Sequence, residues 1–129
     1  MHLQYAMRSC VEAYAKPVLG IDGSDITFSA SKLYFAYGLG NGLYFPFATG
    51  ATSVLEAEPA LPRVILDVTR RFRPTIYFAV PTSFANLLAV PASSWKPADF
   101  SFVRICVSAG EPLPGSVLKR WKDKRESTF

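Results

Sequence analysis

Short apolar runs alternate along the chain with segments whose apolar residues recur every three or four positions. The short runs have the length and β-branched content of strands, and the longer spacing is that of helices with one buried face. The predicted strands are residues 25–30, 52–56, 75–80 and 102–107. The predicted helices are residues 4–15, 33–45, 61–72 and 81–88, and a C-terminal helix that includes 113–121. Strands separated by helices indicate an α/β fold with a mainly parallel sheet and right-handed crossovers.

Two helices carry more specific expectations. Helix 33–45 has aromatic residues on every side, so we expect it to be mostly buried. Helix 61–72 is amphipathic, and its spacing directs Val64, Ile65 and Val68 inward. No internal repeat or low-complexity linker divides the sequence, and its 129 residues, 50% of them hydrophobic, supply enough material for the core of one domain.

The most informative stretch is residues 108–114, directly after the apolar run 103–107. It has the pattern of a buried strand that breaks sharply into a helix. Gly110 allows the backbone to approach a flat ligand closely, while Pro112 and Pro114 fix the direction of the chain. Because ligands of open α/β sheets bind at the carboxyl ends of strands, this exit is a candidate binding site.

Four segments of the sequence resemble motifs of one enzyme family, and they occur along the chain in the same order as in that family. The sequence Ser-Ala-Gly-Glu-Pro at 108–112 is similar to the adenine-side motif of the adenylate-forming acyl-CoA synthetases. Residues 32–41, KLYFAYGLGN, resemble the acid-pocket segment of the benzoate-CoA ligase branch. Gly-Ala-Thr at 50–52 and Val-Pro-Thr at 80–82 lie between them, in the order of the family. These segments span most of the chain.

The resemblance implies a ligase that works in two steps and uses ATP, Mg²⁺ and coenzyme A. An aromatic carboxylate first reacts with ATP to give an acyl-adenylate, and the thiol of coenzyme A then displaces AMP. The chain would be part of the AMP-binding N-terminal domain of such an enzyme. The partners implied are therefore a small aromatic carboxylate and coenzyme A.

The resemblance also assigns site residues. The aromatic acid would lie against Ala36, Tyr37 and Gly38. The nucleotide would lie against Ser108, Ala109, Gly110, Glu111 and Pro112. Pro81 and Thr82 would border the region where the acyl group and the thiol enter. From the residues alone, core packing is favoured at 36–38 and a capped strand-to-helix turn at 108–112, while a proline at a helix start explains Pro81 as well as an entry role does.

No catalytic residue is assigned within the chain. Glu111 has no paired carboxylate nearby in the sequence, which argues against general acid–base chemistry there. The family's phosphate loop, its Tyr-Gly-x-Thr-Glu motif, its ribose-binding aspartate and its catalytic lysine are all absent from the sequence. We therefore expect residues 1–129 to be an internal fragment of the ligase, ending at Phe129, that makes no acyl-adenylate when isolated.

Composition excludes several other classes. The net charge of +4 comes mainly from basic residues at helix ends without interleaved aromatic residues, which predicts no nucleic-acid partner. His2 is the only histidine, so a zinc site or a Ser-His-Asp triad lacks its ligand set, and we expect no metal site. Cys10 and Cys106 lie in apolar segments without pair spacing, and no signal peptide is evident, which predicts a cytoplasmic protein.

Two alternatives to the ligase fragment stay open. The first is an independent nucleotide- or ligand-binding α/β module without ligase activity. The second is a membrane-associated protein, because the stretch from Leu33 to Leu55 has no charged residue and is long enough to span a bilayer. Its glycines, and the change from helical to β-branched pattern at Gly50, favour two short elements instead, so we expect no membrane partner.

Overall fold

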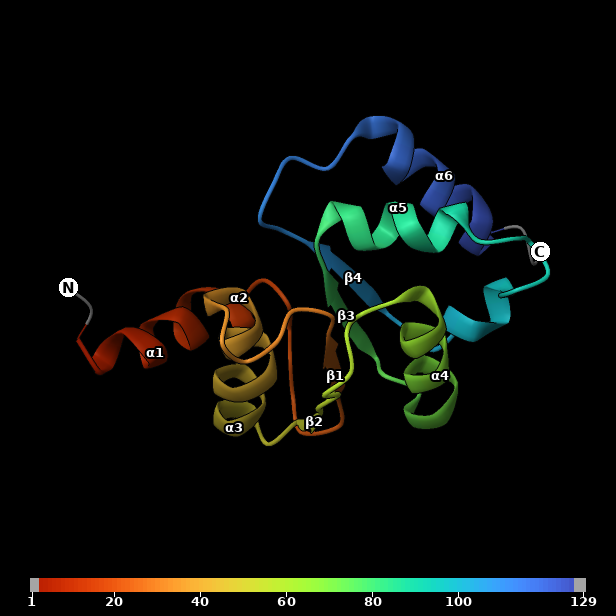
Figure 1. The fold of residues 1–129 in the computed structure, drawn as a ribbon. Helices are drawn as coiled ribbons and strands as arrows, with labels where there is room; N and C mark the ends of the chain where they lie inside the picture. The colour runs from red at the N-terminus through yellow and green to blue at the C-terminus, as the bar shows by residue number, and fades with distance from the viewer. Residues whose placement is uncertain (1–2, 127–129) are drawn as a thin grey trace.

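The computed structural model describes residues 3–126 and has alternating helices and strands (Figure 1). His2 and the end of the chain at 127–129 lie outside the described residues. The strands are β1 (Ile26–Ser29), β2 (Thr52–Val54), β3 (Ile76–Ala79) and β4 (Ile105–Ser108). The helices are α1 (Tyr5–Cys10), η1 (Val11–Ala15), α2 (Ala36–Leu39), η2 (Gly40–Tyr44), α3 (Phe45–Thr49), α4 (Pro62–Phe72), α5 (Pro81–Ala89), η3 (Pro97–Phe100) and α6 (Gly115–Glu126).

All strand pairs are parallel, in the order β2-β1-β3-β4, which confirms the predicted α/β class. The chain runs from β1 outward to β2, returns across β1 to β3, and continues to β4. Connections in the two directions place their helices on opposite faces of the sheet, as crossovers of one hand require. The topology therefore has a switch point between β1 and β3. The connection after β1 leads to one side of the sheet order, and the connection after β3 leads to the other.

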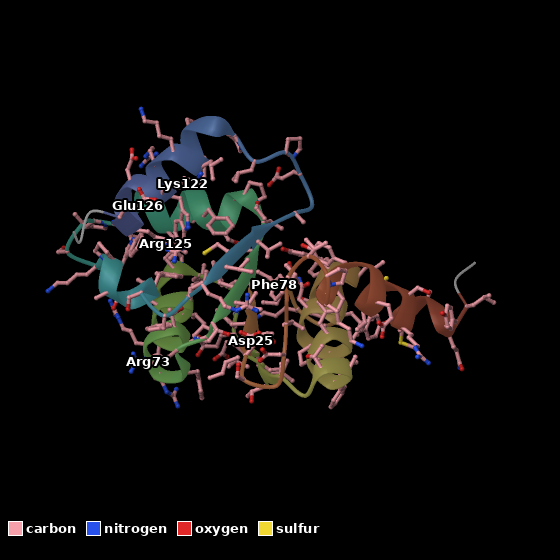
Figure 2. The ribbon with its side chains drawn as sticks, turned by 180° about the vertical axis from the view of Figure 1, so that it is seen from behind. Asp25, Arg73, Phe78, Lys122, Arg125 and Glu126 are labelled. Carbon is pink, nitrogen blue, oxygen red and sulfur yellow. The ribbon has the colours of Figure 1, made fainter. Side chains whose placement is uncertain are left out.

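Strand β3 shows how the two faces are filled. Its four residues are all buried, and they alternate between two apolar clusters. Ile76 and Phe78 belong to the cluster under η1 and α3, whereas Tyr77 and Ala79 belong to the cluster under α4, α5 and α6. Figure 2 shows Phe78 between the sheet and the N-terminal helices. Alternation with full burial is expected for a central strand that is covered on both sides.

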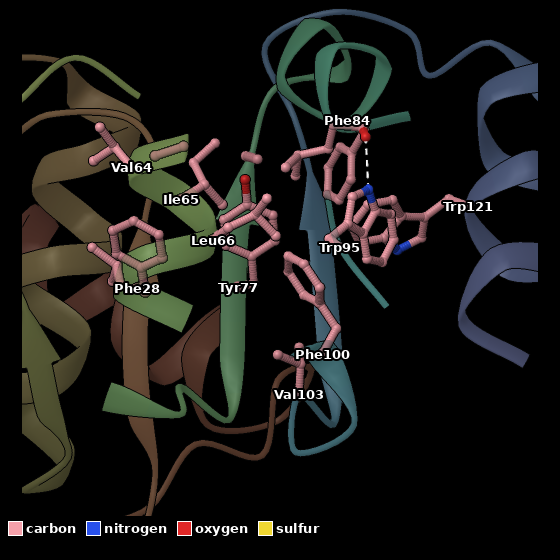
Figure 3. Close-up of a cluster of buried hydrophobic side chains, with 14 of the residues drawn as sticks. Phe28, Val64, Ile65, Leu66, Tyr77, Phe84, Trp95, Phe100, Val103 and Trp121 are labelled. Carbon is pink, nitrogen blue, oxygen red and sulfur yellow. Dashed lines mark hydrogen bonds between the residues drawn. The ribbon is translucent and has the colours of Figure 1, made fainter. Parts of the chain in front are cut away.

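The second of these clusters is rich in aromatic rings (Figure 3). Trp121 of α6 has its ring centroid 4.8 Å from that of Phe84 and 5.1 Å from that of Phe100. Trp95 is buried beside them, and its indole nitrogen donates a hydrogen bond of 2.8 Å to the carbonyl of Leu87. Tilted and edge-on rings at these distances pack favourably, so this cluster fixes α6 against α5 and η3.

A network of polar groups closes the amino edge of the sheet, where Asp25 precedes β1 (Figure 2). The guanidinium of Arg104 donates to both carboxylate oxygens of Asp25, at 2.9 and 2.6 Å, and also to the carbonyls of Leu19 and Gly20. The hydroxyl of Thr75 donates to the same carboxylate at 2.6 Å. These partners lower the pKa of Asp25 to about 2, and the hydrogen bond from Arg104 is the largest cause.

The structure corrects several predicted boundaries and burials. Strand β4 is half-buried, because the sheet order leaves it without a neighbour on one side among the described residues. A loop at 109–114 separates β4 from α6, so the sharp strand-to-helix break is wrong. Helix 33–45 instead runs from Ala36 through Thr49, and Tyr34 and Phe35 are exposed in the turn before it. Cys10 is exposed, although its neighbours in sequence are apolar.

The uncharged stretch from Leu33 to Leu55 forms two elements, as its glycine pattern predicts. The helical part ends at Thr49, and Gly50 adopts a left-handed conformation with φ of 76° before β2 begins at Thr52. Within residues 3–126, no helix has both the length and the apolar content needed to cross a membrane. The cytoplasmic location stays a prediction.

Candidate functional site at the carboxyl edge of the sheet

The carboxyl ends of β1, β3 and β4 lie together on one edge of the sheet. Ser29 of β1 pairs with Phe78 of β3, and Ala79 of β3 pairs with Ser108 of β4. Each of these strands leads into a segment that the sequence marks as a site: 32–41 after β1, 81–82 after β3, and 108–112 at the end of β4. The parallel register thus gathers segments that lie far apart in sequence, at the switch point where such sheets bind ligands.

The loop after β4 is held against the start of α5. The backbone amide of Ala109 donates to the carbonyl of Ala79, and the hydroxyl of Thr82 donates to the carboxylate of Glu111 at 3.0 Å. Gly110 has a φ of 94°, and a Cβ atom there would lie 3.4 Å from the side chain of Val80. The positive φ favours glycine at this position. The predicted nucleotide and entry residues are therefore in contact.

Tyr37 of α2 links the proposed acid segment to the same edge. Its hydroxyl donates to the carbonyl of Val107 at 3.2 Å, and its ring meets that of Phe78 edge-on, with centroids 6.3 Å apart. Burial raises the pKa of Tyr37, so the phenol stays neutral. The ring is thus held at the end of β4 by one hydrogen bond and one aromatic contact.

A cavity of about 710 Å³ opens beside this tyrosine. Ala36 and Tyr37 line it together with Ala109, so one space touches both the acid segment and the nucleotide segment. The opposite wall comes from α1 and η1, through Met7, Cys10 and Tyr14 among others. No charged side chain in the described part of the chain lines it. Its size and apolar walls suit a flat, uncharged ring.

Gly38, Ser108 and Pro112 are among the predicted site residues that do not line this cavity. Gly38 is buried against the backbone of the 31–32 loop, where any Cβ atom would collide with the carbonyls of Ser31 and Lys32. It lines a separate pocket with Lys32 and Ser29. Ser108 turns toward α6 and lines a small cavity with Cys106 and Trp121, while Pro112 is exposed in the loop. Their roles toward a ligand stay predictions, and for Gly38 the close approach of backbone explains the residue.

Sequence analysis placed Asn41 of η2 in the segment 32–41 but assigned it no role, and the structure shows that it lines the same cavity and is only 2% exposed. It lies one helical turn after Tyr37, and residues four apart share a helix face. That spacing could have identified it. The wall formed by α1 and η1 had no such signal, because it depends on how the N-terminal helix packs.

The chemistry available at this edge is binding and orientation. The cavity offers aromatic and aliphatic walls, and the loop 109–112 includes the exposed Gly110. Thr82 donates a hydrogen bond to the carboxylate of Glu111 in this loop. Among residues 3–126, no three His, Cys, Asp or Glu side chains are grouped so that they could bind a metal ion.

Comparison with known proteins gives consistent similarities. The family described as AMP-binding enzymes matches residues 1–128. The chain is 47% identical over 122 residues to the benzoate–CoA ligase of Thauera aromatica, covering 95% of the chain and 23% of that relative. It is 42% identical over 124 residues to the 4-hydroxybenzoate–CoA/benzoate–CoA ligase of Rhodopseudomonas palustris, covering 96% and 23%. A solved benzoate CoA ligase of Burkholderia xenovorans LB400 superimposes with a TM-score of 0.90 at 44% identity, covering 96% and 25%. The chain spans about a quarter of the length of these relatives.

Proposed function

Because the chain belongs to the family of AMP-binding enzymes, we propose that it forms the acid- and adenine-binding wall of an aryl-CoA ligase. Such a ligase activates an aromatic carboxylate, of which benzoate is the simplest, and transfers the acyl group to coenzyme A. Similarity to ligases for benzoate and 4-hydroxybenzoate supports this substrate class. The observation that carries the proposal is the single cavity that Ala36 and Tyr37 share with Ala109.

The proposed reaction has two steps. A carboxylate oxygen attacks the α-phosphorus of ATP and pyrophosphate leaves, which gives the acyl-adenylate. The thiolate of coenzyme A then attacks the acyl carbon, the bond to the adenylate oxygen breaks, and AMP leaves. The phosphoryl transition state needs positive charge, which the cavity walls do not contain. The described residues also provide no ligand set for Mg²⁺, so we assign no step to the metal through this chain.

The residues of this chain bind and orient. Tyr37, fixed to the carbonyl of Val107, forms one wall for the aromatic ring, and Ala36 leaves room for it. Gly110 lets the adenine approach the backbone of the loop after β4. The Thr82–Glu111 hydrogen bond keeps that loop against α5, so the acyl and adenine parts of one adenylate meet a single preformed surface.

The experiment is a chimaera in which residues 1–129 replace the matching segment of the Thauera benzoate–CoA ligase. We expect pyrophosphate release that depends on benzoate, followed by formation of benzoyl-CoA. A folded chimaera that binds ATP but releases no pyrophosphate with any aromatic acid would contradict the ligase proposal. It would favour an independent nucleotide-binding module.

The acid assignment is tested in the same chimaera. Ala36→Phe should fill the space beside Tyr37 and raise the KM for benzoate about ten- to hundredfold, because the ring loses its packing. Tyr37→Ala should act in the same direction by removing the wall. The KM for ATP should stay close to that of the parent in both variants, whose melting temperatures must match the parent because overpacking alone can unfold a protein. Weakened ATP binding with an unchanged benzoate KM would place this segment at the nucleotide instead.

A further inference from the structure

Tyr14 gives the wall opposite Tyr37 an aromatic ring of its own. Both tyrosines line the cavity of about 710 Å³, Tyr37 from α2 and Tyr14 from η1. Tyr14 is 37% exposed, so its ring is not sealed within the core. Burial is the main cause of the raised pKa of Tyr37, and the phenol of Tyr14 is close enough to add to it. Two aromatic side chains from separate elements therefore border one space.

Tyr14 lies on an element that is anchored to the rest of the fold. Its neighbours in η1, Val11 and Ala15, are buried in the apolar cluster on this face of the sheet. The ring of Tyr14 meets that of Phe45 at a tilt, with centroids 6.0 Å apart. The adjoining helix α1, which supplies Met7 and other residues to the same wall, has no buried residue. Within this wall, Tyr14 is thus the aromatic group whose position is fixed by its surroundings.

Two fixed aromatic walls distinguish ligands by the shape of their ring. Aromatic rings in offset or edge-on arrangements gain more than the burial of apolar area alone. A saturated six-membered ring is equally apolar, but it is puckered and has no π-system, so it loses this gain and needs a wider gap. Within residues 3–126, the side chains that line the cavity carry no charge. Selection among uncharged rings therefore depends on thickness and aromatic contact.

We propose that Tyr14 is a specificity-determining residue, which encloses the ring of the bound acid from the side opposite Tyr37 and so selects planar rings over saturated ones. The inference rests on the proposed function of the cavity as the acid site, and it narrows the substrate class. The acids accepted are those whose carboxylate is joined to a planar ring. A single wall at Tyr37 would not set this limit, because a thicker ring could move away from it.

The test compares benzoate with cyclohexanecarboxylate in the chimaera, using the Kd of each acid from titration calorimetry. In the parent, benzoate should bind at least about tenfold more tightly, the range of two aromatic contacts. Tyr14→Leu removes the ring but keeps an apolar side chain. It should reduce this preference about three- to tenfold by weakening benzoate and not cyclohexanecarboxylate. Tyr14→Phe keeps the ring and should keep the preference.

Tyr5→Leu is the matched control. It makes the same substitution at a tyrosine of α1 that is 67% exposed and does not line the cavity. The Kd of both acids should stay at the parent value. A substitution that only loosens the wall would weaken both acids by the same factor, so the ratio of the two Kd values separates selection from a structural defect.

The outcomes separate the two proposals. An unchanged preference in Tyr14→Leu, or equal binding of the two acids by the parent, would overturn the role of Tyr14 and leave the ligase proposal standing. A preference that depends on Tyr14, without pyrophosphate release with any aromatic acid, would support the role of Tyr14 and contradict the ligase. If Tyr14→Leu does not fold, Tyr14→His, which keeps a smaller planar ring, is compared with Tyr14→Met, which has none. Equal preferences in these two would overturn the inference. Failure of the parent chimaera to bind either acid would overturn both proposals.

Discussion

At the amino edge of the sheet, Asp25 accepts hydrogen bonds from Arg104, from Thr75 and from the backbone amide of Asp22. At the carboxyl edge, the hydroxyls of Ser29 and Ser108 are buried without hydrogen-bond partners among the described residues. The same strands run between these two edges, and both edges carry polar side chains. The edges differ in whether these buried side chains are paired. The amino edge pairs its buried polar side chains with each other, whereas the carboxyl edge leaves these two buried hydroxyls unpaired within the described residues.

The comparison separates stability from binding. Paired polar groups such as those around Asp25 tie the loop at 19–25 to the starts of β3 and β4, and removing one partner leaves the others desolvated. The unpaired hydroxyls at the carboxyl edge give no such stabilisation, and that of Ser108 faces the small cavity beside α6. Substitutions at the amino edge should therefore change the free energy of unfolding, and substitutions at the carboxyl edge should change binding.

The largest effect is expected from Arg104→Met. The Asp25 side chain is 5% exposed, so removing its partner leaves a buried carboxylate without compensation. We expect a loss of about 3 kcal/mol in the free energy of unfolding, measured by urea denaturation with the fluorescence of the buried tryptophans. Arg71→Met is the control, because its 3.5 Å pair with Asp67 is exposed, and it should cost less than about 0.5 kcal/mol. Equal losses of unfolding free energy in Arg104→Met and Arg71→Met would show that the buried pair at the amino edge stabilises the fold no more than an exposed pair does.

The second prediction concerns acid. The pKa of Asp25 is about 2 in the folded protein, below the ordinary value of about 3.9 expected when unfolded. Because the folded value is the lower one, the stabilisation is present above about pH 4 and is lost as the pH falls toward 2. It corresponds to about 2 kcal/mol. Asp25→Asn should be less stable than the parent at pH 6, and this deficit should shrink by about that amount at pH 2. A stability deficit that is the same at pH 6 and pH 2 would show that the pKa of Asp25 does not differ between the folded and unfolded states.

A smaller effect is expected at the carboxyl edge from Thr82→Val, which removes the hydrogen bond to Glu111 but keeps the side-chain shape. In the chimaera, the KM for ATP should rise about two- to tenfold, the range of one hydrogen bond to a charged group near solvent. Thr82→Ser should restore the parent value. In Glu111→Met, adding Thr82→Val should have no further effect, and independent effects in the double variant would mean that the two residues do not act through each other.

The smallest effect on stability is expected from Ser108→Ala. The hydroxyl of Ser108 is buried and has no partner within residues 3–126, so its removal should leave the free energy of unfolding within about 0.5 kcal/mol of the parent or raise it. The matched variant Thr75→Val, at the amino edge, removes a hydroxyl that is paired with Asp25 and should be clearly destabilising. Comparable losses in Ser108→Ala and Thr75→Val, measured by denaturation, would contradict the contrast between the edges.

The order of strands and helices follows from local pattern, and the sequence by itself predicted it. The period of the apolar residues identified α4 with Val64, Ile65 and Val68 buried, and the short apolar run at 75–80 identified β3. Gly50 marked the end of a helix because a left-handed residue there requires no neighbour from elsewhere in the chain. The motif at 108–112 similarly identified the family, since it is read from adjacent residues.

Only the tertiary structure decided what depends on contacts across the sheet. The ion pair of Asp25 with Arg104 joins residues 79 positions apart, and it forms because β1 and β4 both start at the same edge. The order β2-β1-β3-β4 left β4 half-buried and placed Asn41 in the cavity beside Ala109. Local periodicity fixes which face of an element is apolar, but which other element covers that face is set by strand order and register.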